Sequence, residues 1–140
     1  SVDQLADRLA GTPLDKIAGV EARGFILGGA LAVKMGLGFV PIRKRGKLPW
    51  KAISQDYELE YGVDQVEIHE DAVAPGERVA VVDDLIATGG TAFAGVKLVE
   101  RLEGVVEDCA FVIDLPELGG ADRLRDAGKR VHCLIAFDGH

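Results

Sequence analysis

Two adjacent carboxylates and a run of small and hydroxyl residues follow one another in the middle of the chain. Asp83 and Asp84 come directly after the apolar stretch 79–82. After two further residues comes a short loop made of Ala87, Thr88, Gly89, Gly90 and Thr91. Such a loop lets several backbone N–H groups and two hydroxyls converge on one anion, and a following helix adds its partial positive charge. The segment therefore predicts a phosphate-binding loop beside an acidic pair.

Carboxylates repel phosphate, so the ligand of this segment must also offer groups that carboxylates accept. Sugar hydroxyls donate hydrogen bonds to carboxylates, and a divalent cation would also bind beside them. A phosphorylated sugar satisfies both halves of the segment. A Walker-type loop would need a Gly-Lys-Ser/Thr ending, which the segment lacks, and a phosphoacceptor aspartate would not explain the hydroxyl residues.

The segment resembles the signature of the type I phosphoribosyltransferases, which bind 5-phosphoribosyl-1-pyrophosphate. The resemblance implies that Asp83 and Asp84 hold the ribose 2′ and 3′ hydroxyls, and that the loop from Ala87 to Thr91 holds the 5′-phosphate. It also implies Mg²⁺ as a cofactor. We assign no side chain as a direct ligand, because the ion would be bound mainly through the substrate.

A second strand-loop-helix unit lies earlier in the chain. Residues 16–20 read as a short buried strand, and Glu-Ala-Arg-Gly at 21–24 leads into a helical run that Gly36 ends. Arg23 in this loop can give an anion two parallel hydrogen bonds, although a lone arginine is more often solvated surface. The loop resembles the pyrophosphate-binding loop of adenine phosphoribosyltransferases, which implies a catalytic role for Arg23 on the leaving group.

A run of basic residues follows the next predicted strand, 39–42. It consists of Arg43, Lys44, Arg45, Lys47 and Lys51. A charge run is usually a solvated loop. In a chain of net charge −7, directly after a core strand, it favours a lid that closes on pyrophosphate. The same resemblance implies that Lys47 is catalytic, that Lys44 binds substrate and that Arg43 acts across a dimer interface.

An alternation of apolar and polar residues predicts a two-stranded hairpin that reaches out of the domain, within a flexible segment of about 43–70. On the sequence alone, Glu60 belongs to the polar face of a strand. By resemblance it matches a glutamate proposed to exchange a proton with the purine, and both interpretations stay open. Tyr61 is placed with the substrate-binding residues, and Leu85 and Leu115, both at strand ends, are placed beside the base.

These side chains must be positioned by strands that alternate with helices, with the loops converging at one end of a sheet. This pattern predicts an α/β fold, a doubly wound parallel sheet with an appended antiparallel hairpin, which is the type I phosphoribosyltransferase fold. With 140 residues, 48% of them hydrophobic, we expect one domain over 1–140. The acidic balance argues against nucleic-acid and membrane surfaces, and no membrane span or signal peptide is visible, so we expect a cytoplasmic protein.

From about Ile17 to the end, the chain resembles bacterial adenine phosphoribosyltransferases. The implied reaction converts adenine and phosphoribosyl pyrophosphate to AMP and pyrophosphate in a homodimer. Two alternatives are a phosphoribosyltransferase for another base and a non-catalytic regulatory domain that senses phosphoribosyl pyrophosphate. The family also carries an N-terminal hood over the purine, and we expect the sequence as printed, which starts at Ser1, to lack it.

Overall fold

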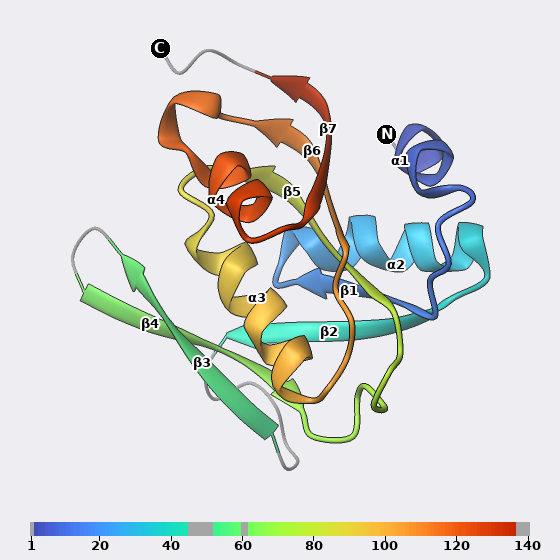
Figure 1. Ribbon diagram of the computed structural model, residues 1–140, viewed down its shortest axis with the longest axis horizontal. Helices are drawn as coiled ribbons and strands as arrows, with labels where there is room; N and C mark the ends of the chain where they lie inside the picture. Colours follow the sequence, from blue (N-terminus) through green and yellow to red (C-terminus); the bar gives the residue numbers. More distant parts are fainter. Residues whose placement is uncertain (1, 45–51, 60–61, 137–140) are drawn as a thin grey trace.

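The computed structural model describes residues 2–44, 52–59 and 62–136, and within them seven strands form one sheet with helices on both faces (Figure 1). The strands are β1 (Lys16–Val20), β2 (Gly38–Lys44), β3 (Ala52–Leu59), β4 (Gly62–His69), β5 (Val79–Ile86), β6 (Asp108–Asp114) and β7 (Arg130–Ala136). The helices are α1 (Val2–Leu9), α2 (Arg23–Met35), α3 (Gly90–Arg101), α4 (Gly120–Asp126) and the short 3₁₀ helix η1 (Pro116–Leu118). None of these helices has the length and hydropathy needed to cross a membrane.

The strand order is β3-β4-β2-β1-β5-β6-β7, and the five strands from β2 to β7 in this order run parallel. In the sheet, β2 lies on one side of β1 and β5 lies on its other side. The direction in which successive strands are added therefore reverses between β1 and β5. In open α/β sheets such a reversal leaves a crevice at the carboxyl ends of the two strands, where ligands bind. The predicted doubly wound parallel sheet is confirmed.

The sheet is buried on both faces, and β5 at its centre shows how. Val79, Ala80, Val81 and Val82 are all buried. Val79 and Val81 belong to the apolar layer that α3 and α4 complete, whereas Ala80 and Val82 belong to the layer that α1 and α2 complete. Because successive side chains of a strand point to opposite faces, a strand covered on both sides needs a continuous apolar run.

Two strands extend further than the sequence pattern predicts. β2 continues through Arg43 and Lys44, which pair with β4, so these two residues lie in the sheet and not on the loop that follows. β5 continues through Asp83 and Asp84 to Ile86, and beyond Val82 its pairs are with β6 alone. The prediction ended both strands at the first charged residue, but backbone pairing with a neighbour sets a strand's length.

The predicted antiparallel hairpin is present as β3 and β4. It extends the sheet through the pairing of β4 with β2 and lies across α3 (Figure 1). Its inward residues Tyr57, Val66 and Ile68 are buried in the same layer as α3. Arg101 at the end of α3 donates a hydrogen bond of 2.6 Å to the carbonyl oxygen of Ser54.

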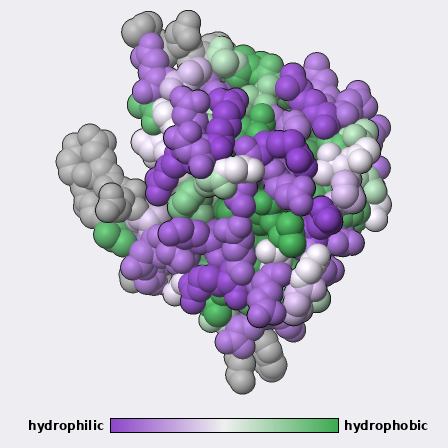
Figure 2. Space-filling model, viewed as in Figure 1, coloured by the Kyte–Doolittle hydropathy of each residue, from purple (hydrophilic) through white to green (hydrophobic). Residues whose placement is uncertain are grey.

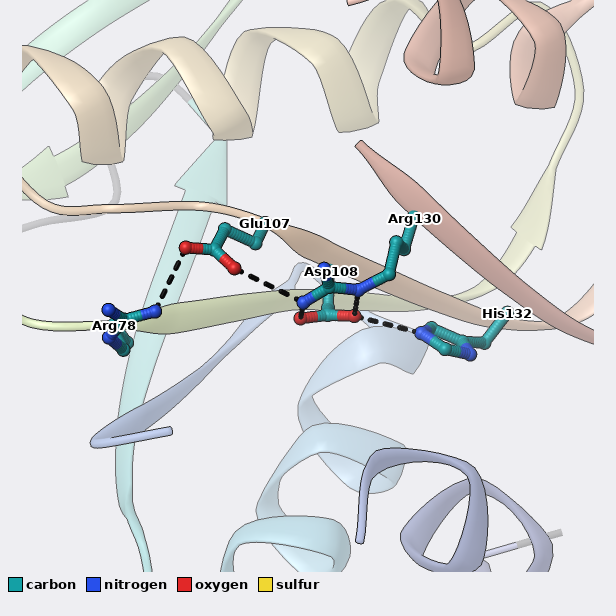
Figure 3. Close-up of polar contacts among 5 residues, drawn as sticks. All are labelled: Arg78, Glu107, Asp108, Arg130 and His132. Atoms are coloured by element: carbon teal, nitrogen blue, oxygen red, sulfur yellow. Dashed lines mark hydrogen bonds and ion pairs between the residues drawn. The ribbon is translucent and has the colours of Figure 1, made fainter. Parts of the chain in front are cut away.

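A network of charged side chains joins the amino ends of the last strands, at the edge opposite the β1–β5 crevice (Figure 3). The buried carboxylate of Asp108 accepts two hydrogen bonds of 2.9 Å from Arg130 and lies 2.9 Å from the His132 ring. Glu107 links Arg130 to Arg78. Burial by itself would raise the pKa of Asp108, but the bonds from Arg130 and His132 together hold that pKa below its ordinary value.

Candidate active site

The loops that follow β1 and β5 meet at the crevice because the two strands are parallel neighbours, and the start of α2 packs close to β5. Gly24, in the first turn of α2, makes this approach possible: a Cβ at this position would lie 3.1 Å from both Asp83 Oδ1 and the carbonyl oxygen of Val82. A larger residue would push the start of α2 away from β5. The glycine therefore sets the distance between the loop that carries Arg23 and the acidic pair.

The loop after β5 is bent by Gly89 and held by α4. Gly89 has a φ of 85°, in the left-handed region that glycine tolerates, and a Cβ there would lie 2.9 Å from the Cα of Gly120. Gly120 donates a hydrogen bond of 3.0 Å to the carbonyl oxygen of Ala87. The first N–H groups of α3, which have no acceptor within the helix, are thereby presented at the end of the loop.

The loop and Asp83 line one small cavity of about 120 Å³. Its lining consists of Asp83, Leu85, Ile86, Ala87, Thr88, Gly89, Gly90, Thr91 and Ala92. The residues predicted to bind phosphate and those predicted to bind sugar hydroxyls are therefore neighbours in space. An anion at the start of α3 would be stabilised by the helix dipole as well as by hydrogen bonds.

The two carboxylates differ in environment although they are adjacent. Asp84 forms an ion pair of 3.3 Å with Arg23, whereas Asp83 Oδ1 accepts the backbone N–H of Asp84 at 2.8 Å. Burial raises the pKa of Asp83 to about 7, the hydrogen bond from Asp84 opposes this, and the Asp84 side chain adds to the rise. Asp83 therefore exchanges its proton near neutral pH.

Arg23 lies beside the acidic pair and still faces solvent. Its side chain is 81% exposed, and only Nη1 contacts Asp84. A guanidinium has five N–H donors, so most of them stay available to an anion in the crevice. The structure thus brings the predicted Arg23 and the predicted acidic pair together.

Glu21 is a site residue that the sequence analysis did not identify. Its Oε1 accepts the backbone N–H of Lys44 at 2.8 Å and lies 3.5 Å from Arg43 Nε. The guanidinium of Arg43 also lies over the ring of Phe25, 5.6 Å from its centroid. Glu21 therefore holds Arg43 against the start of α2. Its position in the sequence, between the end of β1 and Arg23, could have identified it as a site residue.

The side chain of Lys44 contacts the hairpin, whereas that of Arg43 contacts the start of α2. Its Nζ donates to the hydroxyl of Tyr57 at 3.3 Å, and that hydroxyl lies 3.5 Å from Asp64 Oδ2. The bond to Tyr57 is the main cause that raises the pKa of Lys44. This predicted substrate-binding residue consequently ties β2 to the hairpin.

The comparisons with known proteins agree with this geometry. The family model of the phosphoribosyl transferase domain matches residues 3–133. The adenine phosphoribosyltransferases of Ruegeria pomeroyi and Dinoroseobacter shibae are each 61% identical over 139 residues, which is 99% of this chain and 78% of theirs. The chain belongs to the adenine phosphoribosyltransferases.

Solved structures of this family support the assignment at the level of the fold. The adenine phosphoribosyltransferase of Thermoanaerobacter pseudethanolicus has a TM-score of 0.93 and 51% identity, covering 97% of this chain and 78% of that one. The enzyme of Saccharomyces cerevisiae, solved with adenine and an imino-altritol bisphosphate, has a TM-score of 0.87 and 42% identity, covering 95% of this chain and 76% of that one. The predicted membership of the adenine branch is confirmed.

Five further site residues were predicted from the sequence: Lys47, Glu60, Tyr61, Leu85 and Leu115. Lys47, Glu60 and Tyr61 lie outside the described residues, in the segments 45–51 and 60–61. Leu85 is 37% exposed and lines the small cavity. Leu115 donates its backbone N–H to the carbonyl oxygen of Ile86 at 3.0 Å, so it lies beside the end of β5.

The acidic pair is also the part of the crevice that suits a metal ion. Among the described residues, no group of three or more His, Cys, Asp or Glu side chains is arranged to hold a metal ion. Asp83 and Asp84 nevertheless offer the oxygen ligands that Mg²⁺ prefers, and Mg²⁺ is commonly bound by one or two carboxylates together with substrate phosphates. The residues present therefore fit a Mg²⁺ ion shared with a phosphorylated ligand.

Proposed function

We propose that this chain transfers the phosphoribosyl group of 5-phosphoribosyl-1-pyrophosphate to adenine, giving AMP and pyrophosphate. The observation that carries the proposal is the small cavity that Asp83 and the phosphate loop line together, with Asp84 and Arg23 paired beside it. The identities of 57–61% to curated adenine phosphoribosyltransferases support adenine as the base.

The phosphate and ribose of the substrate fix the reacting carbon. In this proposal the N–H groups of the loop 87–91 and the hydroxyls of Thr88 and Thr91 bind the 5′-phosphate, while Asp83 and Asp84 accept the ribose hydroxyls. These contacts do not take part in the bond that breaks. Their binding energy orients the anomeric carbon toward the base, which lowers the barrier by positioning.

The leaving pyrophosphate gains negative charge as its bond to the anomeric carbon lengthens and that carbon becomes positively charged. Cations placed where this charge develops stabilise the transition state more than the ground state. We assign this role to Arg23 and Lys47, with Arg43 acting on the site of a second subunit. A bound Mg²⁺, held through the substrate beside Asp83 and Asp84, would neutralise part of the same charge.

The base side of the site uses residues around the hairpin turn and two strand ends. We propose that Glu60 exchanges a proton with the purine as the new bond forms, and that Tyr61, Leu85 and Leu115 line the base. Leu85 and Leu115 are supported by their positions at the ends of β5 and β6. Apolar contacts of this kind bind a flat base without competing for its polar edges.

A second copy of the chain is proposed to cover one face of α2, giving a homodimer in the cytoplasm. Ile26 and Val33 are 81% and 84% exposed, and their spacing of seven residues places them on the same side of the helix. A Cβ at Gly29, between them, would meet open space. The guanidinium of Arg43 lies over the ring of Phe25, which is next to Ile26, so an interface on this face would bring Arg43 to its edge.

Sedimentation tests the proposed dimer. The unmodified chain should sediment as a dimer, and the double variant Ile26→Asp with Val33→Asp should sediment as a monomer.

A turnover assay with a panel of bases tests the proposed reaction. With phosphoribosyl pyrophosphate and Mg²⁺, adenine should give pyrophosphate and AMP much faster than hypoxanthine, guanine or uracil. Faster turnover of another base would indicate a different phosphoribosyltransferase. Tight binding of phosphoribosyl pyrophosphate with no turnover of any base would indicate a sensing domain.

A further inference from the structure

A wide groove continues from the phosphate loop between the hairpin and the helices α3 and α4. Its volume is about 1060 Å³. Thr88, Gly90 and Thr91 of the loop line its inner end, and the side chains of Phe93, Lys97 and Arg123 line its helical wall. Figure 2, in the same view as Figure 1, shows a face of the molecule that is mainly hydrophilic, with hydrophobic residues visible among the hydrophilic ones. The groove is larger than a single phosphate group requires, and the mechanism above uses only its inner end.

The helical wall of the groove carries two cations arranged around one aromatic ring. Lys97 Nζ lies 5.1 Å and the Arg123 guanidinium 4.5 Å from the centroid of the Phe93 ring. Within the described part of the chain, neither cation forms a hydrogen bond or an ion pair with another side chain. Cation–π contacts are weak at exposed sites, so both charges stay available to an anion in the groove.

The backbone places both cations close to the phosphate loop. Phe93 donates its N–H to the carbonyl oxygen of Gly89 at 2.8 Å, and Arg123 donates to that of Gly119 at 3.0 Å. Gly120, which follows Gly119, is bonded to Ala87 of the loop. Arg123 therefore lies about one helical turn, roughly 5 Å, beyond the contact between α4 and the loop. Long basic side chains span such a distance.

We infer that Lys97 and Arg123 form a subsite for the second phosphoryl group of a nucleoside 5′-diphosphate. The inference rests on the proposed function, because the first phosphoryl group and the ribose would occupy the AMP positions in the small cavity. The β-phosphoryl group would then extend into the groove and meet the two cations over Phe93. ADP would bind more tightly than AMP and inhibit the transfer reaction in competition with phosphoribosyl pyrophosphate.

The hairpin wall of the groove offers the competing explanation. Asp56 lines that wall, and its carboxylate accepts a hydrogen bond of 2.6 Å from Gln65. If the cations served only to attract this acidic wall, their removal would change turnover and leave ADP and AMP equally affected. A ligand subsite changes the affinity for ADP alone, so the two explanations give different results.

Calorimetric titration of the whole chain with AMP and with ADP, without divalent cations, tests the inference. The double variant Lys97→Gln with Arg123→Gln should bind ADP roughly tenfold more weakly, since each cation loses a charge-assisted bond discounted for exposure, and AMP affinity should change less than about threefold. The difference should shrink at high salt.

A matched control keeps the same change of charge away from the groove. Lys34→Gln with Arg125→Gln removes two exposed cations paired with Asp3 and Asp122, and it should leave the ADP to AMP ratio unchanged. An unchanged ratio in the groove variant, or equal weakening of both nucleotides, would overturn the subsite while the proposed function stands. Failure of AMP to bind the unmodified chain would overturn the proposed function and the subsite together.

Discussion

Asp83 and Asp84 are residues of the same type in two different environments, and their side chains therefore have different properties. Asp84 is paired with Arg23, whereas Asp83 is partly buried beside another carboxylate, and its burial is the main cause that raises its pKa to about 7. A partly buried carboxylate that is not paired with a cation destabilises the folded chain once it is ionised. A ribose hydroxyl or a metal ion at this position would favour the ionised form, so Asp83 connects ligand binding with stability.

Asp83→Asn should therefore stabilise the chain while it weakens ligand binding. Between pH 4 and 7 the folded state holds a proton that the unfolded chain has released, so the stability of the unmodified chain falls as the pH rises through this window. At pH 8 the variant should be more stable by about 1–3 kcal/mol and at pH 4 about equally stable, as measured by thermal unfolding. The exposed Asp122→Asn is the control. A variant that is less stable at pH 8 would contradict the environment assigned to Asp83.

Lys47 is assigned to the leaving group, and its kinetic effect can be separated from that of Arg23. Lys47→Ala should lower kcat by about tenfold or more and change KM by less than about threefold, because its charge matters most as pyrophosphate leaves. Arg23→Ala should affect both constants, since Arg23 lies beside the acidic pair in the crevice. Steady-state kinetics measure the split. A raised KM with an unchanged kcat in Lys47→Ala would exclude the lid role.

The hairpin strands β3 and β4 flank Glu60 and Tyr61 in the sequence, the two residues proposed above for the base side of the site. The hydrogen bond from Arg101 to Ser54 anchors β3 at its start, and the bond from Lys44 to Tyr57 ties β2 to the middle of the hairpin. Both anchors lie along the strands and hold the hairpin against β2 and α3.

Tyr57→Phe should loosen the hairpin and leave the core unchanged. The variant removes the hydroxyl that accepts from Lys44 but keeps the buried ring, so the local loss should be about 0.5–1.5 kcal/mol. Hydrogen exchange should show faster exchange in β3 and β4 and unchanged exchange in β5 and β6. As a control, Gln55→Ala on the same strand should have little effect. Uniform acceleration throughout the sheet would mean that the tyrosine hydroxyl supports the whole fold.

The elements show what the sequence could and could not predict. The apolar run 79–82 and the glycine-rich loop after it determined the central strand, the loop and its ligand class, because burial and backbone freedom leave direct traces in composition. The extension of β2 through Lys44 and the role of Glu21 were not predictable in this way. Both depend on contacts between segments far apart in the chain, namely β2 with β4 and Glu21 with Arg43.

At the scale of the whole molecule, the carboxyl and amino edges of the sheet have different roles. The carboxyl edge holds the crevice, with a partly protonated carboxylate and exposed cations that suit a ligand. The amino edge holds the network around Asp108, in which the described charges are paired with one another (Figure 3). Substitutions at the amino edge should therefore change stability and leave ligand binding unchanged.

Asp108→Ala should lower stability and leave catalysis intact. It removes three contacts to Arg130 and His132, which are partly exposed, so the expected loss is about 1–3 kcal/mol at neutral pH. Because the pKa of Asp108 is lowered, this contribution is present above its ordinary pKa and is lost as the pH falls through the lowered value. Thermal unfolding and KM for phosphoribosyl pyrophosphate test it together. A large change in KM with an unchanged melting temperature would contradict the division between the edges.

AMP formation from adenine and phosphoribosyl pyrophosphate tests the central claim most directly, measured for the unmodified chain and for Asp83→Asn with Asp84→Asn. The unmodified chain should form AMP with Mg²⁺ present. The double variant should stay folded and lose roughly a hundredfold or more in kcat/KM, since two charge-assisted contacts to the ribose or metal are removed. AMP formation at the unmodified rate by the double variant, or none by the unmodified chain, would contradict the account of the site.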